Sequence, residues 1–151
     1  MSSFHAFAIH VPIGLSLIAP FVCALLAFLI LRRGLDRRVW WLAVLVASTI
    51  AVGSFVASSS GDTERHSLRD GAPMALVDEH EAAGDWVVIS SCVFAIVSLV
   101  AALDRNEKRR KILMIVSAVI ACHTASTTIR TGYLGGKLVY EHNVTAFRPG
   151  H

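Results

Sequence analysis

The chain has 151 residues, of which 54% are apolar and only 17% are charged. A soluble domain typically has about a quarter of its residues charged. This composition argues against a soluble enzyme and against a secreted module held together by disulfides. The formal charge of +3 would suggest a nucleic-acid partner, but the positions of the basic residues, considered below, give no support for one.

Four long stretches of the sequence contain no Asp, Glu, Lys or Arg. Each has 18 to 22 residues, close to the roughly 20 that a helix needs to cross a ~30 Å hydrocarbon core. These stretches are residues 11–31, 39–60, 86–103 and 112–129. With flanking residues added, we expect membrane-spanning helices over approximately 8–31, 39–60, 82–103 and 112–133.

The basic residues predict the orientation of these spans. Nine of the fourteen lie in two short segments, 32–38 and 104–111, as is typical of cytoplasmic loops. We therefore expect both chain ends and the connection over 61–81 to lie on the outer, periplasmic side. The sequence thus predicts an all-α protein with one domain over 1–151: a multi-pass four-helix bundle of the bacterial inner membrane, with an outer C-terminal segment over 135–151.

The seven histidines are unevenly placed. Neither basic segment contains one, and six lie at or beyond the outer ends of the spans. Counted outward from the basic segments, His10 and His80 lie 22 and 24 residues away, roughly 33 and 36 Å along a helix. They should reach the same level on different helices. His123, twelve residues from its basic segment, is expected about 18 Å along, near mid-membrane.

We interpret these histidines as haem ligands. Two neutral imidazoles from different helices can hold one haem iron inside a four-helix bundle. Small residues in the second and fourth spans would admit the macrocycle, and outer cations such as Arg130 and Lys137 would pair with its propionates. Two other interpretations stay open: a neutral histidine bonded to Ser or Thr across the bundle, and histidines that the headgroup region tolerates.

The sequence offers less support for other kinds of chemistry. It has no glycine-rich phosphate loop and no nucleophile–base–acid set. The four charge-free stretches offer no Asp, Glu, Lys or Arg to line an ion path through the membrane, which argues against an ion-coupled transporter or a proton pump. The segment Asp-Glu-His-Glu over 78–81, with His66 nearby, could hold a bare metal ion. An electron carrier is favoured over a stand-alone enzyme.

Both ends of the sequence resemble a large bacterial family of predicted four-helix membrane proteins. Residues 5–15, His-Ala-Phe-Ala-Ile-His-Val-Pro-Ile-Gly-Leu, resemble its opening His-Pro-x-x-Val-His-Phe-Pro-Ile-(Ala/Gly)-Leu. Residues 135–144, Gly-Gly-Lys-Leu-Val-Tyr-Glu-His-Asn-Val, are similar to its closing Gly-Gly-x-Leu-Val-Tyr-x-His-Gly-Val. The family has no assigned function, and some members look like haem-binding subunits of redox systems. By this resemblance, His5, His10 and His142 match motif histidines.

These observations predict a membrane-bound b-type haem protein, with one or two haems, that transfers electrons at the outer face. The expected axial ligands are His10, His80 and His142, with His5 and His123 as further candidates. Seven acidic residues against two basic ones over 61–85 would dock a basic redox partner, or would form a solvated connection.

Two other functions stay open: a non-catalytic subunit of a larger membrane complex, and a metal-handling membrane protein. Membrane lipid is an expected partner and nucleic acid is not. The sequence leaves a homo-oligomer open.

Overall fold

The chain folds into long helices. A computed structural model describes residues 3–65 and 73–142, and of residues 3–9 and 61–65 it describes the backbone alone. This part of the chain contains no strand; it forms α1 (Ser3–Arg33), the short 3-10 helix η1 (Arg37–Trp40), α2 (Trp41–Arg65), α3 (Met74–Leu103) and α4 (Glu107–Tyr140). The predicted all-α class with four long helices is confirmed.

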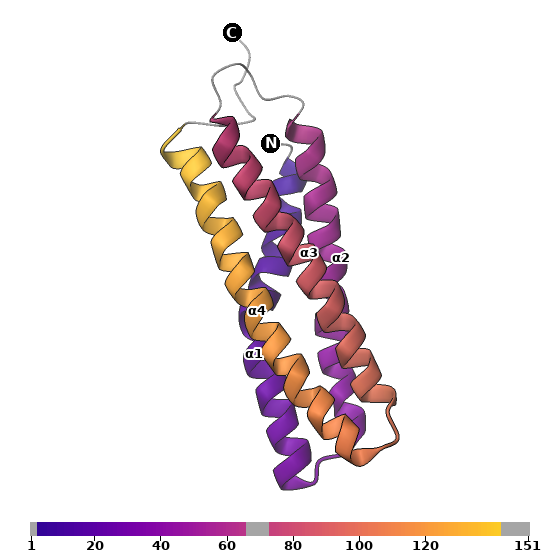
Figure 1. The fold of residues 1–151 in the computed structure, drawn as a ribbon. Helices are drawn as coiled ribbons and strands as arrows, with labels where there is room; N and C mark the ends of the chain where they lie inside the picture. Colours follow the sequence, from indigo (N-terminus) through magenta and orange to yellow (C-terminus); the bar gives the residue numbers. More distant parts are fainter. Residues whose placement is uncertain (1–2, 66–72, 143–151) are drawn as a thin grey trace.

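The four helices pack as one bundle (Figure 1). Each helix packs against the next in chain order, and α4 also packs against α1, whereas α1 and α3 lie diagonally and do not pack together in the described part. The start of α1, the end of α2, the start of α3 and the end of α4 share one end, here called the histidine end because it carries His10, His80 and His142. The opposite end, here called the basic end, carries η1 and the α3–α4 connection.

The core is narrow because small side chains dominate the contact faces. Ala43, Ala47, Ala101 and Ala121 are fully buried in it, together with the larger Trp40, Phe94, Ile50 and Met114. The expected small-residue faces of the second and fourth spans contribute buried Ser54 and Ser117. Small residues allow helices to approach closely in a membrane, where lipid offers no hydrophobic drive for association.

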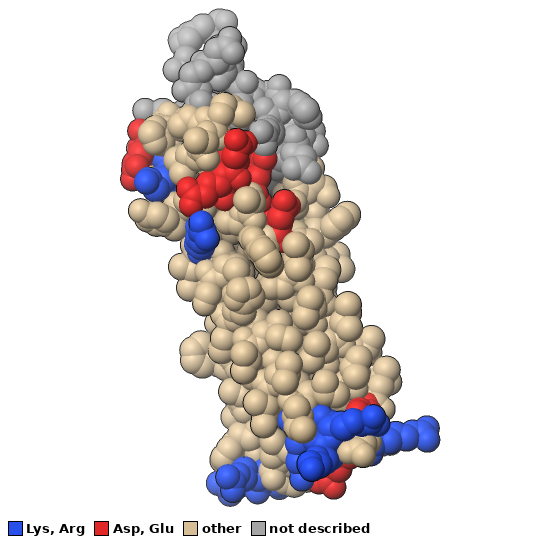
Figure 2. Space-filling view, viewed as in Figure 1, with Lys and Arg blue, Asp and Glu red and all other residues tan. Residues whose placement is uncertain are grey.

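Large apolar side chains cover the outside of the bundle. Phe21 is 76% exposed, Val52 66% and Val119 64%. A soluble protein rarely exposes so much contiguous apolar surface, and such a surface is typical of contact with a membrane or a partner. It lies between two charged ends, with acidic side chains gathered at the histidine end and basic ones at the other (Figure 2). Each of the four helices is long and apolar enough to cross a membrane, so the chain is a multi-pass membrane protein.

At the histidine end the helices run beyond the expected spans. Helix α3 begins at Met74, within the connection expected over 61–81, and α4 continues to Tyr140, within the segment expected over 135–151. A charge-free stretch marks only the part of a helix that fits hydrocarbon. A helix continues into water when one of its faces still packs on a neighbour, and both extensions bury apolar side chains, Val77 and Leu138.

Candidate functional site

His80 lies in the contact between α3 and α4. Its ring is half-buried, and Nδ1 is 3.1 Å from the main-chain oxygen of Thr131. A carbonyl oxygen only accepts hydrogen bonds, so Nδ1 donates in this contact. In the neutral ring Nε2 then carries the lone pair. The contact therefore fixes both the tautomer and the orientation of the imidazole.

The same ring packs onto Gly135, one helical turn beyond Thr131. A Cβ atom at position 135 would lie 3.0 Å from Cε1 of His80, 3.5 Å from Nδ1 and 3.7 Å from Nε2. A Cβ at the neighbouring Gly136 would meet nothing within 4 Å. Of the two adjacent glycines in the closing motif, Gly135 is therefore the one that makes room for His80.

An ion pair joins the same two helices beside His80. Nη2 of Arg130 lies 2.9 Å from Oε1 of Glu79, and both side chains are largely exposed. Lys137 lies about two helical turns beyond Arg130 on α4. Its Nζ is 3.8 Å from Oε2 of Glu141 and 5.9 Å from the ring centre of Tyr133. Both cations expected to meet haem propionates thus have carboxylate partners within this chain.

The other predicted histidines lie on α1, on α4 and in the turn after α4. His10 is exposed on α1, the helix diagonal to α3. His142 is exposed in the turn after α4. His123 is exposed on α4, eight residues before Thr131, which is roughly 12 Å along the helix. The backbone of His5 belongs to α1, and its side chain lies outside the described part.

The acidic segment over 78–81 does not form a metal cluster by itself. Successive residues of a helix point in different directions; Glu79 turns to Arg130 and His80 turns to Thr131. Among the described residues, no group of three His, Cys, Asp or Glu side chains could hold a metal ion. His66 lies outside the described residues.

Sequence reasoning placed His80 at this end by topology but missed both of its α4 partners. The available signal was the pair of adjacent glycines, because glycine inside a helix costs stability relative to alanine and so suggests a close approach. The pair did not indicate which side chain approaches.

The fold and the site define a class: an integral membrane four-helix bundle with an apolar belt and a histidine fixed between two helices at one end. The chain belongs to the family described as "Predicted membrane protein (DUF2231)", whose model matches residues 1–148. The expected membership of a four-helix membrane family of unknown function is thereby confirmed. Comparisons with curated proteins and with solved structures find no match.

Proposed function

We propose that this protein is a membrane-bound b-type haem protein that transfers electrons at its histidine end, where His80 would be a ligand to the haem iron. The observation that carries the proposal is the fixed ring of His80, bonded through Nδ1 to Thr131 and packed on Gly135. A ligating imidazole usually donates its other N–H to a carbonyl or carboxylate, which orients the lone pair and raises its basicity.

The available donors fit haem better than a bare metal ion. A protein-bound zinc or copper ion usually draws three or four ligands, and no such group exists among the described residues. Haem would need only one or two donors from the protein, and it would supply reversible one-electron chemistry at its iron. His142, His10 and His5 are the candidates for a second iron ligand.

The remaining residues of this end would hold and serve the group. Arg130 and Lys137 would bind the propionates by exchanging their present carboxylate partners, both of which are exposed to solvent. Exposed Asp78, Glu79 and Asp85 would attract a basic redox partner, because complementary charge mainly raises the rate of encounter.

We infer the location from the charge at the two ends. Lys and Arg in excess mark the cytoplasmic side of a membrane protein, and they gather at the basic end (Figure 2). The histidine end would then face the periplasm, with the protein in the inner membrane of a bacterium.

Absorption spectra of the detergent-purified full chain test the proposal. Protein from haem-replete cells should show a Soret band, and reduction with dithionite should sharpen the α and β bands. A matched variant separates ligation from packing. In His80→Asn the amide nitrogen is as many bonds from Cα as Nδ1 is, so it can still donate to Thr131 but offers iron no imidazole.

His80→Asn should therefore lose or shift the α band while its thermal unfolding stays close to that of the wild type. His123→Leu tests the remaining candidate ligand. His123 is exposed on α4, roughly 12 Å along the helix from Thr131, so we expect this variant to keep the wild-type spectrum. A colourless wild-type protein would refute the proposal. It would favour the alternative of a structural subunit in which His80 only joins two helices.

A further inference from the structure

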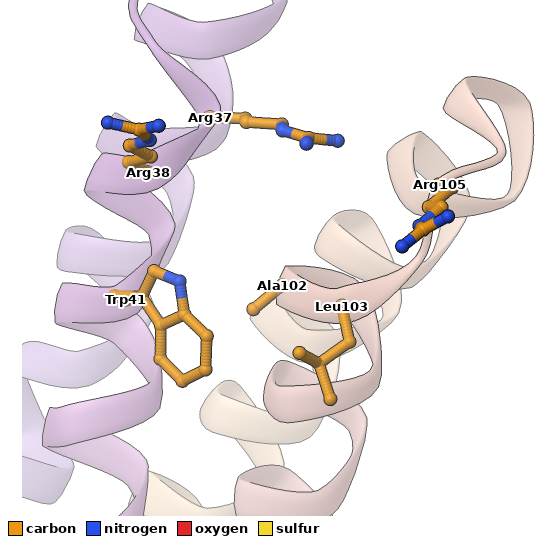
Figure 3. A pocket seen from close by; sticks show the side chains of 6 residues that line it. All are labelled: Arg37, Arg38, Trp41, Ala102, Leu103 and Arg105. Carbon is orange, nitrogen blue, oxygen red and sulfur yellow. The ribbon is translucent and has the colours of Figure 1, made fainter.

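A pocket opens at the basic end, between η1 with the start of α2 and the end of α3 (Figure 3). Its volume is about 240 Å³, and it is lined by Arg37, Arg38, Trp41, Ala102, Leu103 and Arg105. The side chain of Arg37 extends from η1 across the opening, and the guanidinium of Arg105 turns toward it from the other side (Figure 3). Arg37, Arg38 and Arg105 are here called the pocket arginines.

The side chains of the pocket arginines have no ion pair or hydrogen bond with any described residue. The three carboxylates at this end have other partners. Asp104 pairs with Arg109 at 3.2 Å, and Glu107 pairs with Lys111 at 2.6 Å. Asp36 accepts a main-chain N–H of η1 at 2.8 Å. Three guanidinium groups therefore line one opening without an ion-pair partner among the described residues.

The wall of the pocket is held in place by buried contacts. Trp40 is fully buried and donates its Nε1–H to the main-chain oxygen of Ser98 at 3.1 Å, which fixes η1 against α3. Gly34 takes a positive φ of 69° in the turn after α1, a conformation that glycine adopts without strain, and Asp36 caps η1. The arginines are thus presented on a preformed scaffold.

Below the arginines the pocket becomes apolar. Trp41 and Leu103 are both exposed on the outside of the bundle, and with Ala102 they line its wall. Tryptophan is enriched where a membrane protein crosses from hydrocarbon to headgroup. The pocket therefore offers charge at headgroup depth and apolar surface directly next to it.

We propose that this pocket binds the headgroup phosphate of an anionic phospholipid, with an acyl chain along Trp41 and Leu103. Guanidinium groups bind phosphate oxygens through paired, charge-assisted hydrogen bonds. Basic pockets at the headgroup level of helical membrane proteins suit such lipids. A soluble phosphate would use the arginines alone, whereas a phospholipid also covers the exposed apolar wall. The site is independent of the histidine end and of any haem.

Lipid binding to the full chain in detergent micelles tests the proposal. Native mass spectrometry would count bound phosphatidylglycerol and phosphatidylcholine, offered at equal mole fraction, and thermal unfolding would be followed in the same mixtures. The wild type should prefer phosphatidylglycerol by at least about tenfold. Inorganic phosphate and glycerol phosphate at the same concentration should neither displace the lipid nor raise the unfolding temperature as far.

The test variant replaces all three pocket arginines by glutamine, and its milder counterpart is Arg105→Gln alone. The control variant removes the same charge from the same end without touching the pocket: Arg32→Gln, Arg33→Gln and Lys108→Gln, all at exposed positions. The pocket variant should lose the preference and the control should keep most of it, with Arg105→Gln in between. Equal loss in pocket and control variants, no lipid preference in the wild type, or equal protection by soluble phosphate would each overturn the proposal.

Discussion

Gly135→Ala is the sharpest single perturbation of the contact that fixes His80. The new methyl group would lie 3.0 Å from Cε1 of His80, where an ordinary contact begins at 3.4 Å. The ring must therefore retreat by roughly 0.4 Å or the helices must separate. Retreat lengthens a hydrogen bond to Thr131 that is already 3.1 Å long.

The matched control is the adjacent glycine. Gly135 and Gly136 lie in the same stretch of α4, so both alanine variants gain the same helix propensity, about 0.5–1 kcal/mol. Gly136→Ala meets nothing within 4 Å and should be stabilising by about that amount. Gly135→Ala adds the cost of overpacking, about 1–3 kcal/mol, and weakens a hydrogen bond whose net contribution is about 1 kcal/mol. The two variants should therefore differ by about 2 kcal/mol.

Thermal and denaturant unfolding in one detergent would measure this difference, with haem-free protein so that no bound group contributes. The propensity gain cancels between the variants, so the difference reports the contact of residue 135 with His80. Equal stability of Gly135→Ala and Gly136→Ala would refute the packing of His80 on Gly135. In the background His80→Ala the difference should vanish, since no ring then meets the new methyl group.

Two further predictions concern helix packing. Gly53→Ala should destabilise the bundle by about 1–3 kcal/mol, because its Cβ would lie 3.1–3.2 Å from the rigid ring of Pro12. The control Gly84→Ala has open space around it and should not be destabilising. Similar unfolding curves for the two variants would contradict the α1–α2 contact. Trp40→Phe should destabilise the protein by about 1–3 kcal/mol through the lost bond to Ser98 and a small cavity, and unfolding midpoints equal to those of the wild type would show that this buried bond contributes nothing.

Part of the candidate site was accessible from the sequence. The level of a residue along a helix follows from counting at about 1.5 Å per residue, so the placement of His80 toward the histidine end needed no structure. The side chain that meets each small residue could not be found by counting. Gly53 packs against Pro12 and Gly135 against His80, because the space beside a small residue depends on which side chain the neighbouring helix presents.

The neighbours of a histidine cannot be counted in this way. His10 and His80 are predicted to lie at one level on different helices, and the structure adds that α1 and α3 lie diagonally in the bundle and that the ring of His80 contacts α4. The position of a residue along the bundle axis follows from its own helix alone. The rotation of a helix about its axis and the choice of its neighbours depend on the packing of all four helices.

The sequence by itself determined the class, the number of spans and the family. A helix that crosses lipid needs a charge-free stretch about 20 residues long. This condition concerns consecutive residues only, so it can be checked in the sequence without knowing the tertiary structure. Only the tertiary structure decided which residues meet across helices: His80 with Thr131 and Gly135, and the pocket arginines from two separate connections. These contacts depend on which helices are neighbours and on how each helix is rotated about its axis. Small residues allow helices to approach closely in many such arrangements, and only the packing of all four helices selects one of them.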